Sequence, residues 1–289
     1  MISKRLLLVD GTQLFYRSFF GIRGLSTSAG DPSNAVFGFV RGIHQLIELW
    51  TPSHIAVTWD GGVPASRLAL LPEYKAQRPP MPDTLRQQYE PVAEFLQLAG
   101  ITMIRLEHEE ADDVLASLVK AGHPDAEEIM IVTADKDLYQ LVSDRVVMVA
   151  WGKDDKRMGR AEVYAKTGVY PEQIVDWLAM TGDAVDNIPG VEGVGPKTAA
   201  KLLEQHGSLA ALWPKIETVT PPRIHDALLA ARERVERNLA LVKLQDTLDC
   251  FPGWEALITK AEKPSRMRSF YARMEFHSLI QGCDQGELF

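Results

Sequence analysis

The sequence predicts an α/β protein with a mostly parallel central sheet and helices on both faces. Three apolar runs of strand length each end in an aspartate: 5–10, 53–60 and 128–135. Between them, apolar residues recur at helical spacing: 33–50, 85–99 and 112–121. Strands that alternate with helices are typical of a parallel sheet, whose ligands bind beyond the carboxyl ends of the strands. We therefore expect Asp10, Asp60 and Asp135 at one edge of the sheet.

The composition is that of a globular protein. The chain has 289 residues, enough for one large domain or for a large and a small one, with 46% apolar and 24% charged residues. The apolar run from Leu6 to Val9 is too short for a signal peptide or a membrane span. Cys250 and Cys283 make neither a disulfide framework nor a zinc site, so free thiols are expected. These features predict a cytoplasmic protein with no membrane partner, and we expect a monomer.

Four carboxylates crowd the start of the helix predicted at 112–121. They are Glu109, Glu110, Asp112 and Asp113. One or two acids in a first helical turn are favoured by the helix dipole and by unpaired N–H groups, but four repel one another. Solvation of the excess charge is the simplest explanation, and a bound cation is the alternative. The three strand-end aspartates at the same edge favour the cation, and hence a metal site.

The segment 64–84 interrupts the alternation of strands and helices. It has too many prolines for one helix and too few apolar residues for a core element. It carries Arg67, Lys75 and Arg78, with Arg86 just beyond it. A solvated surface loop would explain this composition, but long ordered loops in compact domains are usually lids or binding segments. Cations at the rim of an acidic site would face phosphates.

After about residue 165 the pattern is helical. A loop carries Asp183 and Asp186, and the segment 188–203 then shows glycines at a tight turn followed by helical spacing. This is the helix–hairpin–helix pattern, in which glycines let the backbone approach a phosphate and a helix N-terminus offers free N–H groups. Lys197 adds a mobile charge. Such a turn binds a nucleic-acid backbone without sequence preference, although an ordinary helix–turn–helix corner is the alternative.

Five motifs in this order resemble those of the bacterial 5′-nuclease family. They are Leu8–Thr12, Glu73–Arg78, Glu110–Asp113, Thr133–Gln140 and Thr181–Val191. The chain is similar to the N-terminal 5′→3′ exonuclease domain of DNA polymerase I, with flap endonucleases as wider relatives. The likeness extends from about residue 5 to Leu279. It implies a PIN-like core with a helical arch or gateway.

The resemblance also implies two clusters of metal ligands. The first cluster would be Asp10, Asp60, Glu110 and Asp112, and the second Asp135, Asp137, Asp183 and Asp186, with Asp113 between them. Ligands of oxygen alone suit Mg²⁺ or Mn²⁺ rather than zinc. Two such ions can activate a water and stabilise the attacking and leaving oxygens of an in-line displacement.

Residues that contact DNA are implied in the same way. Lys75 and Arg78 would reach the scissile phosphate and act in catalysis with Asp10, Asp60 and Asp112, while Tyr74 would stack on an unpaired base. A potassium ion would lie at the hairpin 190–197. The implied DNA contacts are Arg17, Tyr74, Lys75, Arg78, Gly190, Gly193, Gly195, Lys197 and Thr198.

The expected function is a divalent-metal-dependent 5′→3′ exonuclease and 5′-flap endonuclease for branched or nicked DNA in replication and repair. The net charge of −8 argues against a nucleic-acid partner at first. Of the 39 acids, nine belong to the two clusters, which leaves 30 against 31 lysines and arginines. The surface outside the site is therefore close to neutral, and DNA would be bound through local placement of cations.

Two other functions remain open on the sequence alone. A non-catalytic binder of branched DNA could keep the hairpin, but would not need the full set of acids. A PIN-like ribonuclease would share the acidic sheet edge, but would not need the hairpin at 190–197. A haloacid-dehalogenase-type phosphatase is disfavoured, because Leu8 stands where that class has an acid two residues before Asp10. A free-standing nuclease and a fragment of a polymerase are not distinguished, although the tail after Leu279 favours a complete chain.

We expect three regions along the chain. Residues 1–165 would form the catalytic core, including the arch region 64–97, and residues 166–281 a helical DNA-binding region with the helix–hairpin–helix at 183–206. Single helices are predicted at 223–243 and 264–281. Residues 282–289 would be a flexible tail.

The tail resembles the peptide with which bacterial replication proteins bind the β sliding clamp. Gln285, Leu288 and Phe289 fit a Gln-x-x-Leu-Phe pattern, and two terminal hydrophobic residues suit a groove. A frayed terminus of no function is the alternative.

Deletion of residues 285–289 is expected to abolish binding to the clamp and to leave cleavage of free DNA intact. Surface plasmon resonance on immobilised clamp measures the first effect, and a cleavage assay without clamp the second. Unchanged clamp binding after the deletion would show that the tail has no such role.

Overall fold

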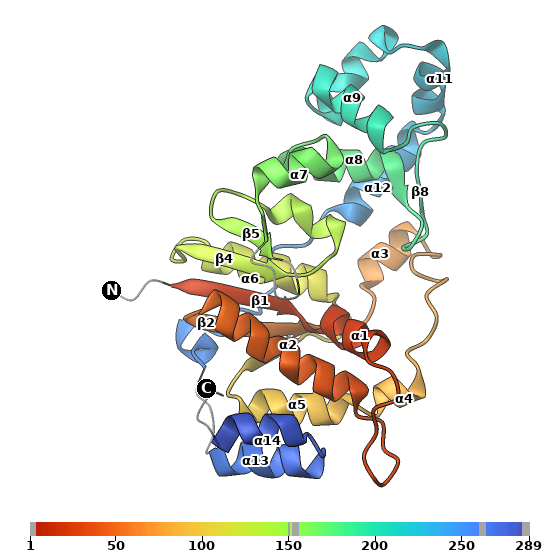
Figure 1. Cartoon of the computed structure of the whole chain (residues 1–289). Helices are drawn as coiled ribbons and strands as arrows, with labels where there is room; N and C mark the ends of the chain where they lie inside the picture. Colours follow the sequence, from red (N-terminus) through yellow and green to blue (C-terminus); the bar gives the residue numbers. More distant parts are fainter. Residues whose placement is uncertain (1–3, 150, 152–155, 260–263, 285–289) are drawn as a thin grey trace.

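The computed structural model describes residues 4–149, 151, 156–259 and 264–284 (Figure 1). The predicted clamp residues Gln285, Leu288 and Phe289 lie outside the described residues. Within the described ranges, every helix is too short or too polar to cross a membrane.

A six-stranded sheet lies at the centre of the molecule, with the strands in the order β3-β2-β1-β4-β5-β6. All neighbours pair in parallel except β5 and β6, which are antiparallel. The strands are β1 (Arg5–Asp10), β2 (His54–Trp59), β3 (Thr102–Arg105), β4 (Glu128–Val132), β5 (Val146–Val149) and β6 (Arg157–Met158). The mostly parallel sheet that the sequence predicts is confirmed. Strand β3 was not predicted, because it has only four residues and lacks a terminal aspartate.

Both faces of the sheet are buried, since alternate residues of each strand enter two different core clusters. In β1, Leu6 and Leu8 belong to one cluster, and Leu7 and Val9 to the other. The longer helices that share the cluster of Leu7 are α1 (Gly11–Gly21), α2 (Asn34–Trp50), α5 (Tyr89–Leu98), α13 (Pro264–Arg273) and α14 (His277–Asp284). On the opposite face α6 (Ala111–Gly122) packs against the sheet.

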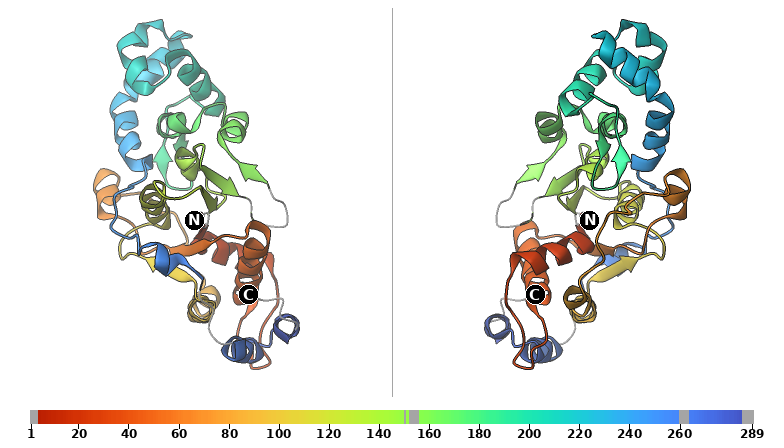
Figure 2. Two further views of the ribbon diagram at one scale, coloured as in Figure 1. Left: turned by 90° about the vertical axis from the view of Figure 1, so that its left-hand side faces the viewer. Right: turned by 90° about the vertical axis from the view of Figure 1, so that its right-hand side faces the viewer.

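The helical region continues from the face that α6 covers and forms one end of an elongated molecule, with α13 and α14 at the other end (Figure 2). Its helices are α7 (Arg160–Thr167), α8 (Ile174–Thr181), α9 (Pro196–His206), α10 (Leu209–Leu212), α11 (Pro222–Ala230) and α12 (Arg232–Val242). The short strands β7 (Gly182–Asp183) and β8 (Ile188–Pro189) pair beside α8. Short 3₁₀ helices are η1 (Lys136–Leu141), η2 (Pro171–Gln173), η3 (Trp213–Thr218) and η4 (Trp254–Leu257).

The proline-rich excursion forms two short helices with turns between them, as Figure 1 shows beside α1. They are α3 (Ala65–Leu70) and α4 (Asp83–Arg86). Two predicted helices are each broken in the structure. The segment 223–243 divides at Ala231, whose backbone (φ −100°, ψ 5°) leaves the helical region, and the segment 264–281 divides before His277, where Glu275 has φ of 58°. Neither break carries a glycine or proline, so apolar spacing alone suggested continuous helices.

His44 links three helices of the first face. Its ring on α2 meets the edges of Phe95 on α5 and Tyr271 on α13, at centroid distances of 5.8 and 6.4 Å. Burial lowers the pKa of His44 to about 4 from its ordinary 6.5. Between these two pH values the unfolded chain binds a proton that the folded chain does not. The contribution of His44 to stability therefore falls as the pH falls through this window.

Replacing His44 with Gln is expected to make folding less sensitive to acid. The stability of the wild type relative to the His44→Gln variant should fall by about 2 kcal/mol between pH 7 and pH 5. Urea unfolding at a series of pH values measures this difference, with exposed His108→Gln as the control. Parallel stability curves for the wild type and His44→Gln would contradict the prediction.

Candidate active site

Asp10 ends β1 and Asp60 follows the neighbouring parallel strand β2, so both lie at the same edge of the sheet. Asp10 caps α1 and accepts hydrogen bonds from the Gln13 N–H (2.9 Å) and the Thr133 hydroxyl (3.2 Å). Asp60 accepts one from the Ala111 N–H (2.9 Å), at the start of α6. Each carboxylate is thus oriented by the helix that begins beside it.

Two glycines allow the chain to pack closely behind these aspartates. A Cβ on Gly11 would lie 2.7 Å from the Thr58 carbonyl oxygen, and one on Gly61 only 1.6 Å from the Leu106 carbonyl oxygen. The Gly61 N–H donates to the Glu109 carbonyl (2.8 Å). This contact brings the end of β2 against the start of α6, and hence Asp60 beside the acidic cluster.

A cleft of about 690 Å³ opens at this edge of the sheet. The acidic side chains that line it are Asp10, Asp60, Asp112 and Asp135, and Lys75 and Arg78 line it too. Burial raises the pKa of Asp10 to about 7, with the charges of Asp60 and Asp135 adding to the shift against the lowering effect of the Gln13 hydrogen bond. Burial, followed by the charges of Asp135 and Asp10, also raises the pKa of Asp112 well above its ordinary value. These four carboxylates therefore form one electrostatic group.

A second acidic group adjoins the first. Asp183 and Asp186 line a neighbouring cleft of about 500 Å³, and Asp135 lines both clefts. Burial raises the pKa of Asp137 to about 8, and the charges of Asp135 and Asp183 contribute. Asp135 is therefore the acid that joins the two groups, a position that the family resemblance suggested for Asp113.

The base of the arch region is docked onto the loop between β7 and β8. Lys75 donates to Glu110 (2.7 Å) through its ammonium and to the Asp186 carbonyl (3.1 Å) through its N–H, and its φ is 56°. Arg78 donates to the Asp186 carboxylate (2.5 Å). Asn187 accepts from the Gln77 amide (2.6 Å). Lys75 and Arg78 thus enter the acidic cleft from a segment that is fixed at its base.

Arg67 does not face solvent or phosphate, contrary to the expectation for the cations of this segment. Arg67 is 6% exposed, and its guanidinium binds Asp113 with both terminal nitrogens (2.6 and 2.8 Å) and Glu110 with one (2.6 Å). Its third N–H group donates to the Leu241 carbonyl of α12 (3.1 Å). Burial lowers the pKa of Arg67, but the hydrogen bond to Asp113 and the two carboxylate charges outweigh it and raise the pKa.

The sequence predicts that Asp113 binds a metal ion, but in the structure its carboxylate is bound by protein groups. Its side chain is 1% exposed, and besides Arg67 it accepts the Gln245 N–H (2.8 Å). Since protein donors hold both oxygens of this carboxylate, the ligand set that we propose below leaves Asp113 out. Glu110 lies between Arg67 and Lys75 at the back of the cleft.

Tyr74 cannot stack on a base in the way that the family resemblance implied. Its ring is only 5% exposed, and its hydroxyl lies 3.2 Å from Glu110 and 3.3 Å from Asp186. Burial raises its pKa further than the two acids do. The partly exposed aromatic side chains that line the cleft are Tyr16 and Tyr89. Neither was singled out in the sequence, since an aromatic residue at helical spacing is usually core.

The glycine-rich turn after β8 combines a tightly packed and an open part. A Cβ on Gly190 would lie 2.3 Å from the Thr181 carbonyl oxygen, so this glycine serves packing. Gly193 (φ 74°) and Gly195 are exposed, and α9 begins after Gly195 without a side-chain cap. Lys197 is exposed and Thr198 partly so. Pro196, the first residue of α9, has no N–H, so the backbone donors open to an anion are those of Lys197 and Thr198.

The donor set of the two acidic groups consists of carboxylate oxygens, which suits a hard divalent cation. Among the residues that the structure describes, no group of three acids, histidines or cysteines has a ready-made metal geometry. The match of these residues to a divalent cation therefore depends on the type of their donor atoms and on how closely they lie together. A parallel sheet whose carboxyl edge carries such acids, faced by Lys75 and Arg78, has the layout of a phosphodiester hydrolase.

Comparison with known proteins gives the family. Residues 5–168 match "5'-3' exonuclease, N-terminal resolvase-like domain", and residues 169–265 match "5'-3' exonuclease, C-terminal SAM fold". The chain is 37% identical to a 5'-3' exonuclease of Aquifex aeolicus over 98% of its own length and 96% of that protein. It is also 37% identical to the thermostable DNA polymerase I of Thermus thermophilus, over 96% of this chain and 33% of the polymerase.

A solved structure agrees with these matches. The T5 D15 flap endonuclease, in a pseudo-enzyme–product complex with DNA and metal ions, shares the fold with a TM-score of 0.69 and 27% identity. The match covers 83% of this chain and 89% of that one. The chain belongs to the 5'-3' exonuclease family and is a nuclease. It spans most of the Aquifex relative and about a third of the polymerase.

Replacing Arg67 with Met is expected to destabilise the fold by about 3–5 kcal/mol, because it leaves Glu110 and Asp113 buried without their shared partner. Urea unfolding measures the loss. The matched control is Arg86→Met, whose exposed pair with Asp83 should contribute at most about 1 kcal/mol. A loss for Arg67→Met no larger than that of the control would contradict the role of this network.

Proposed function

We propose that the chain is a divalent-metal-dependent 5′→3′ exonuclease and structure-specific 5′-flap endonuclease acting on branched or nicked DNA in replication and repair. The observation that carries this proposal is the cleft of Asp10, Asp60, Asp112 and Asp135, into which Lys75 and Arg78 enter. The T5 flap endonuclease with DNA and metal ions supports the same substrate and cofactor class.

The ligand set that we propose is divided at Asp135. Asp10, Asp60 and Asp112 would hold one ion with Asp135, and Glu110 would support them from behind. The second ion would be held by the acids of the adjoining group: Asp135, Asp137, Asp183 and Asp186. Oxygen donors favour Mg²⁺ or Mn²⁺, and a pair of such ions activates water and stabilises both reacting oxygens of the phosphate.

The cations of the chain would act on the phosphate itself. Lys75 and Arg78 lie on the arch side of the cleft, where they can stabilise the charge that develops on the phosphate oxygens. The expected products carry a 3′-hydroxyl and a 5′-phosphate. Tyr16 offers a partly exposed ring in the same cleft, which suits stacking with an unpaired base.

The duplex would be held at the hairpin between β8 and α9. The open N–H groups of α9 and Lys197 would contact the DNA backbone, with a potassium ion at residues 190–197. Exposure of Gly193 and Gly195 supports this placement. Arg17, which is exposed on α1 beyond Asp10, would contact another part of the DNA.

We retain the expected division into a core of residues 1–165, a helical DNA-binding region of residues 166–281 and a tail. A cytoplasmic monomer that binds the sliding clamp through this tail remains our proposal. The tail sequence alone supports the clamp contact.

Cleavage of a 5′-flap DNA tests the function. We expect cleavage with Mg²⁺, none with EDTA, and a loss of rate on the order of a hundredfold or more for Asp112→Asn, since it removes a negative ligand. The matched control is Asp246→Asn. Asp246 forms an exposed ion pair with Lys120, and neither residue lines the cleft. Mn²⁺ binding by electron paramagnetic resonance should weaken in Asp112→Asn alone.

The rival functions predict different results in the same assay. Metal-independent cleavage, or full activity of Asp112→Asn, would refute the proposed mechanism. Binding of the flap without cleavage would identify a non-catalytic binder of branched DNA. Preference for an RNA flap over a DNA flap would identify a PIN-like ribonuclease.

A further inference from the structure

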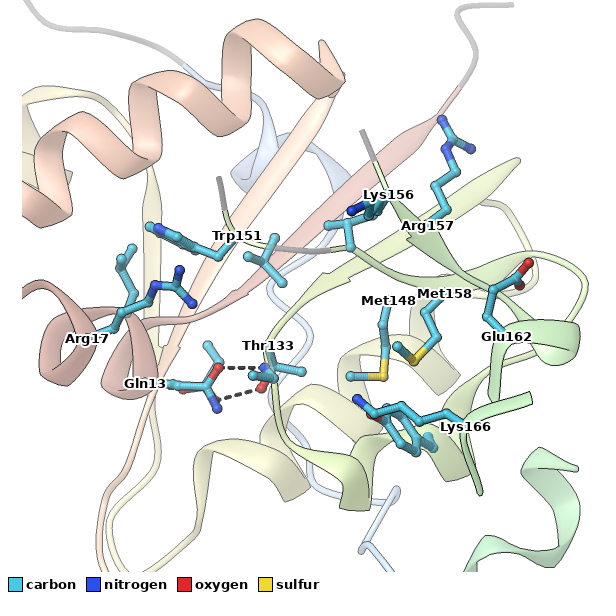
Figure 3. Close-up of a pocket in the computed structure, with 16 residues that line it drawn as sticks. Gln13, Arg17, Thr133, Met148, Trp151, Lys156, Arg157, Met158, Glu162 and Lys166 are labelled. Carbon is cyan, nitrogen blue, oxygen red and sulfur yellow. Dashed lines mark hydrogen bonds between the residues drawn. The ribbon is translucent and has the colours of Figure 1, made fainter. Parts of the chain in front are cut away.

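A second cavity, of about 450 Å³, adjoins the carboxylate cleft, and Figure 3 shows residues that line it. It is bounded by α1, the carboxyl ends of β4 and β5, β6 and α7. Asp10 and Gln13 line both spaces. The Gln13 amide oxygen accepts the Ala134 N–H (2.5 Å), which fixes the side chain at the boundary. The cavity is therefore a neighbour of the catalytic cleft, and apart from Asp10 and Arg17 its lining residues have no part in the function proposed above.

The floor and one wall of this cavity are apolar and polarizable. Met148 and Val149 of β5 are buried, and Met158 of β6 lies beside them. Trp151 forms the wall near α2, where it packs so closely that a Cβ on Gly42 would lie 2.1 Å from the indole. Thioether and indole groups of this kind contact the flat face of a ring favourably.

Positive charge lies at the opening. Figure 3 shows Arg17 on α1 and Lys166 on α7 reaching toward the cavity from opposite sides. The Lys166 ammonium donates to the Tyr139 hydroxyl (2.6 Å) and lies 5.3 Å from the centre of that ring, so its position is fixed. Glu162, the acid at the rim, accepts the Gly159 N–H at the start of α7 (3.0 Å). The held ammonium of Lys166 and the exposed guanidinium of Arg17 thus flank an apolar floor.

We propose that this cavity binds one nucleotide of the substrate DNA, adjacent to the scissile phosphate. The base would lie against Met148 and Trp151, and its phosphate would contact Arg17 and Lys166. The volume lies in the range of small-ligand sites, and aromatic and apolar surfaces beside cations are the means by which proteins hold unpaired nucleotides. The boundary shared with Asp10 places this nucleotide next to the reacting phosphate. This inference rests on the proposed nuclease function.

A free nucleotide tests the cavity without the catalytic reaction. Titration calorimetry of the full chain with dAMP, in EDTA so that no divalent ion assists, should show one saturable site. Arg17→Ala, Lys166→Ala and Trp151→Ala should each weaken binding at least tenfold, while Trp151→Phe, which keeps a ring, should retain most of it. Matched controls are Arg41→Ala and Lys120→Ala, which remove exposed cations outside the cavity and should change the affinity less than twofold.

Cleavage of a 5′-flap DNA with Mg²⁺ gives the second measurement. Arg17→Ala and Trp151→Ala should raise KM at least fivefold, and thermal unfolding shows that each variant is folded. Absence of dAMP binding, equal affinity of dAMP for these variants and the wild type, or binding of inorganic phosphate as tight as that of dAMP overturns the assignment. A wild type that cleaves no flap overturns the proposed function instead, so the two failures are distinguishable.

Discussion

The site depends on one buried ionic network centred on Arg67. Its guanidinium joins the arch region to Glu110 and Asp113 at the start of α6 and to the Leu241 carbonyl, 174 residues away in the sequence. Two carboxylates removed from water each cost several kcal/mol unless they are paired and hydrogen-bonded. An arginine provides five N–H donors in one plane, which a lysine does not. The start of α6, which carries Asp112, is thus held in place by a guanidinium that donates to three acceptor groups: two carboxylates and one carbonyl.

In the cleft beside this network, the carboxylates lie close to one another and lack a full set of hydrogen-bond donors. Burial and mutual repulsion raise the pKa of Asp10 to about 7 and that of Asp137 to about 8. The contrast with Asp113 is informative, because both kinds of acid are buried and only one has a full set of donors. Crowded, perturbed carboxylates are characteristic of functional sites, whereas a fully paired acid holds the fold together. Geometry therefore separates the acids of one sequence cluster into those that line the cleft, such as Asp112, and those that are paired within the fold, such as Asp113.

The order of strands and helices along the chain made the strand-end aspartates predictable from the sequence. The environment of the other site residues depends on burial by distant segments and was not predictable. Asp10 ends β1, Asp60 directly follows β2 and Asp135 comes three residues after β4, so the alternation of elements is enough to assign them a common edge. Whether a given acid or aromatic is enclosed depends on residues far away in the chain. Gln245 closes over Asp113, and the loop at 183–187 closes over Tyr74. The charge of Arg67 likewise suggested a surface position. Its burial could not be predicted, because its partners come from distant parts of the chain that only the fold brings together.

The distribution of charge explains how an acidic chain can act on DNA. Outside the nine acids of the two predicted clusters, 30 acidic residues face 31 lysines and arginines, so there is no strong positive field to attract DNA from a distance. Recognition must then rest on cations held at short range. Lys75 and Arg78 are fixed by the loop between β7 and β8, and Lys166 is fixed by Tyr139. Binding of this kind requires the substrate to reach the cleft in the correct shape before it gains charge contacts, which is the selectivity that a structure-specific nuclease needs.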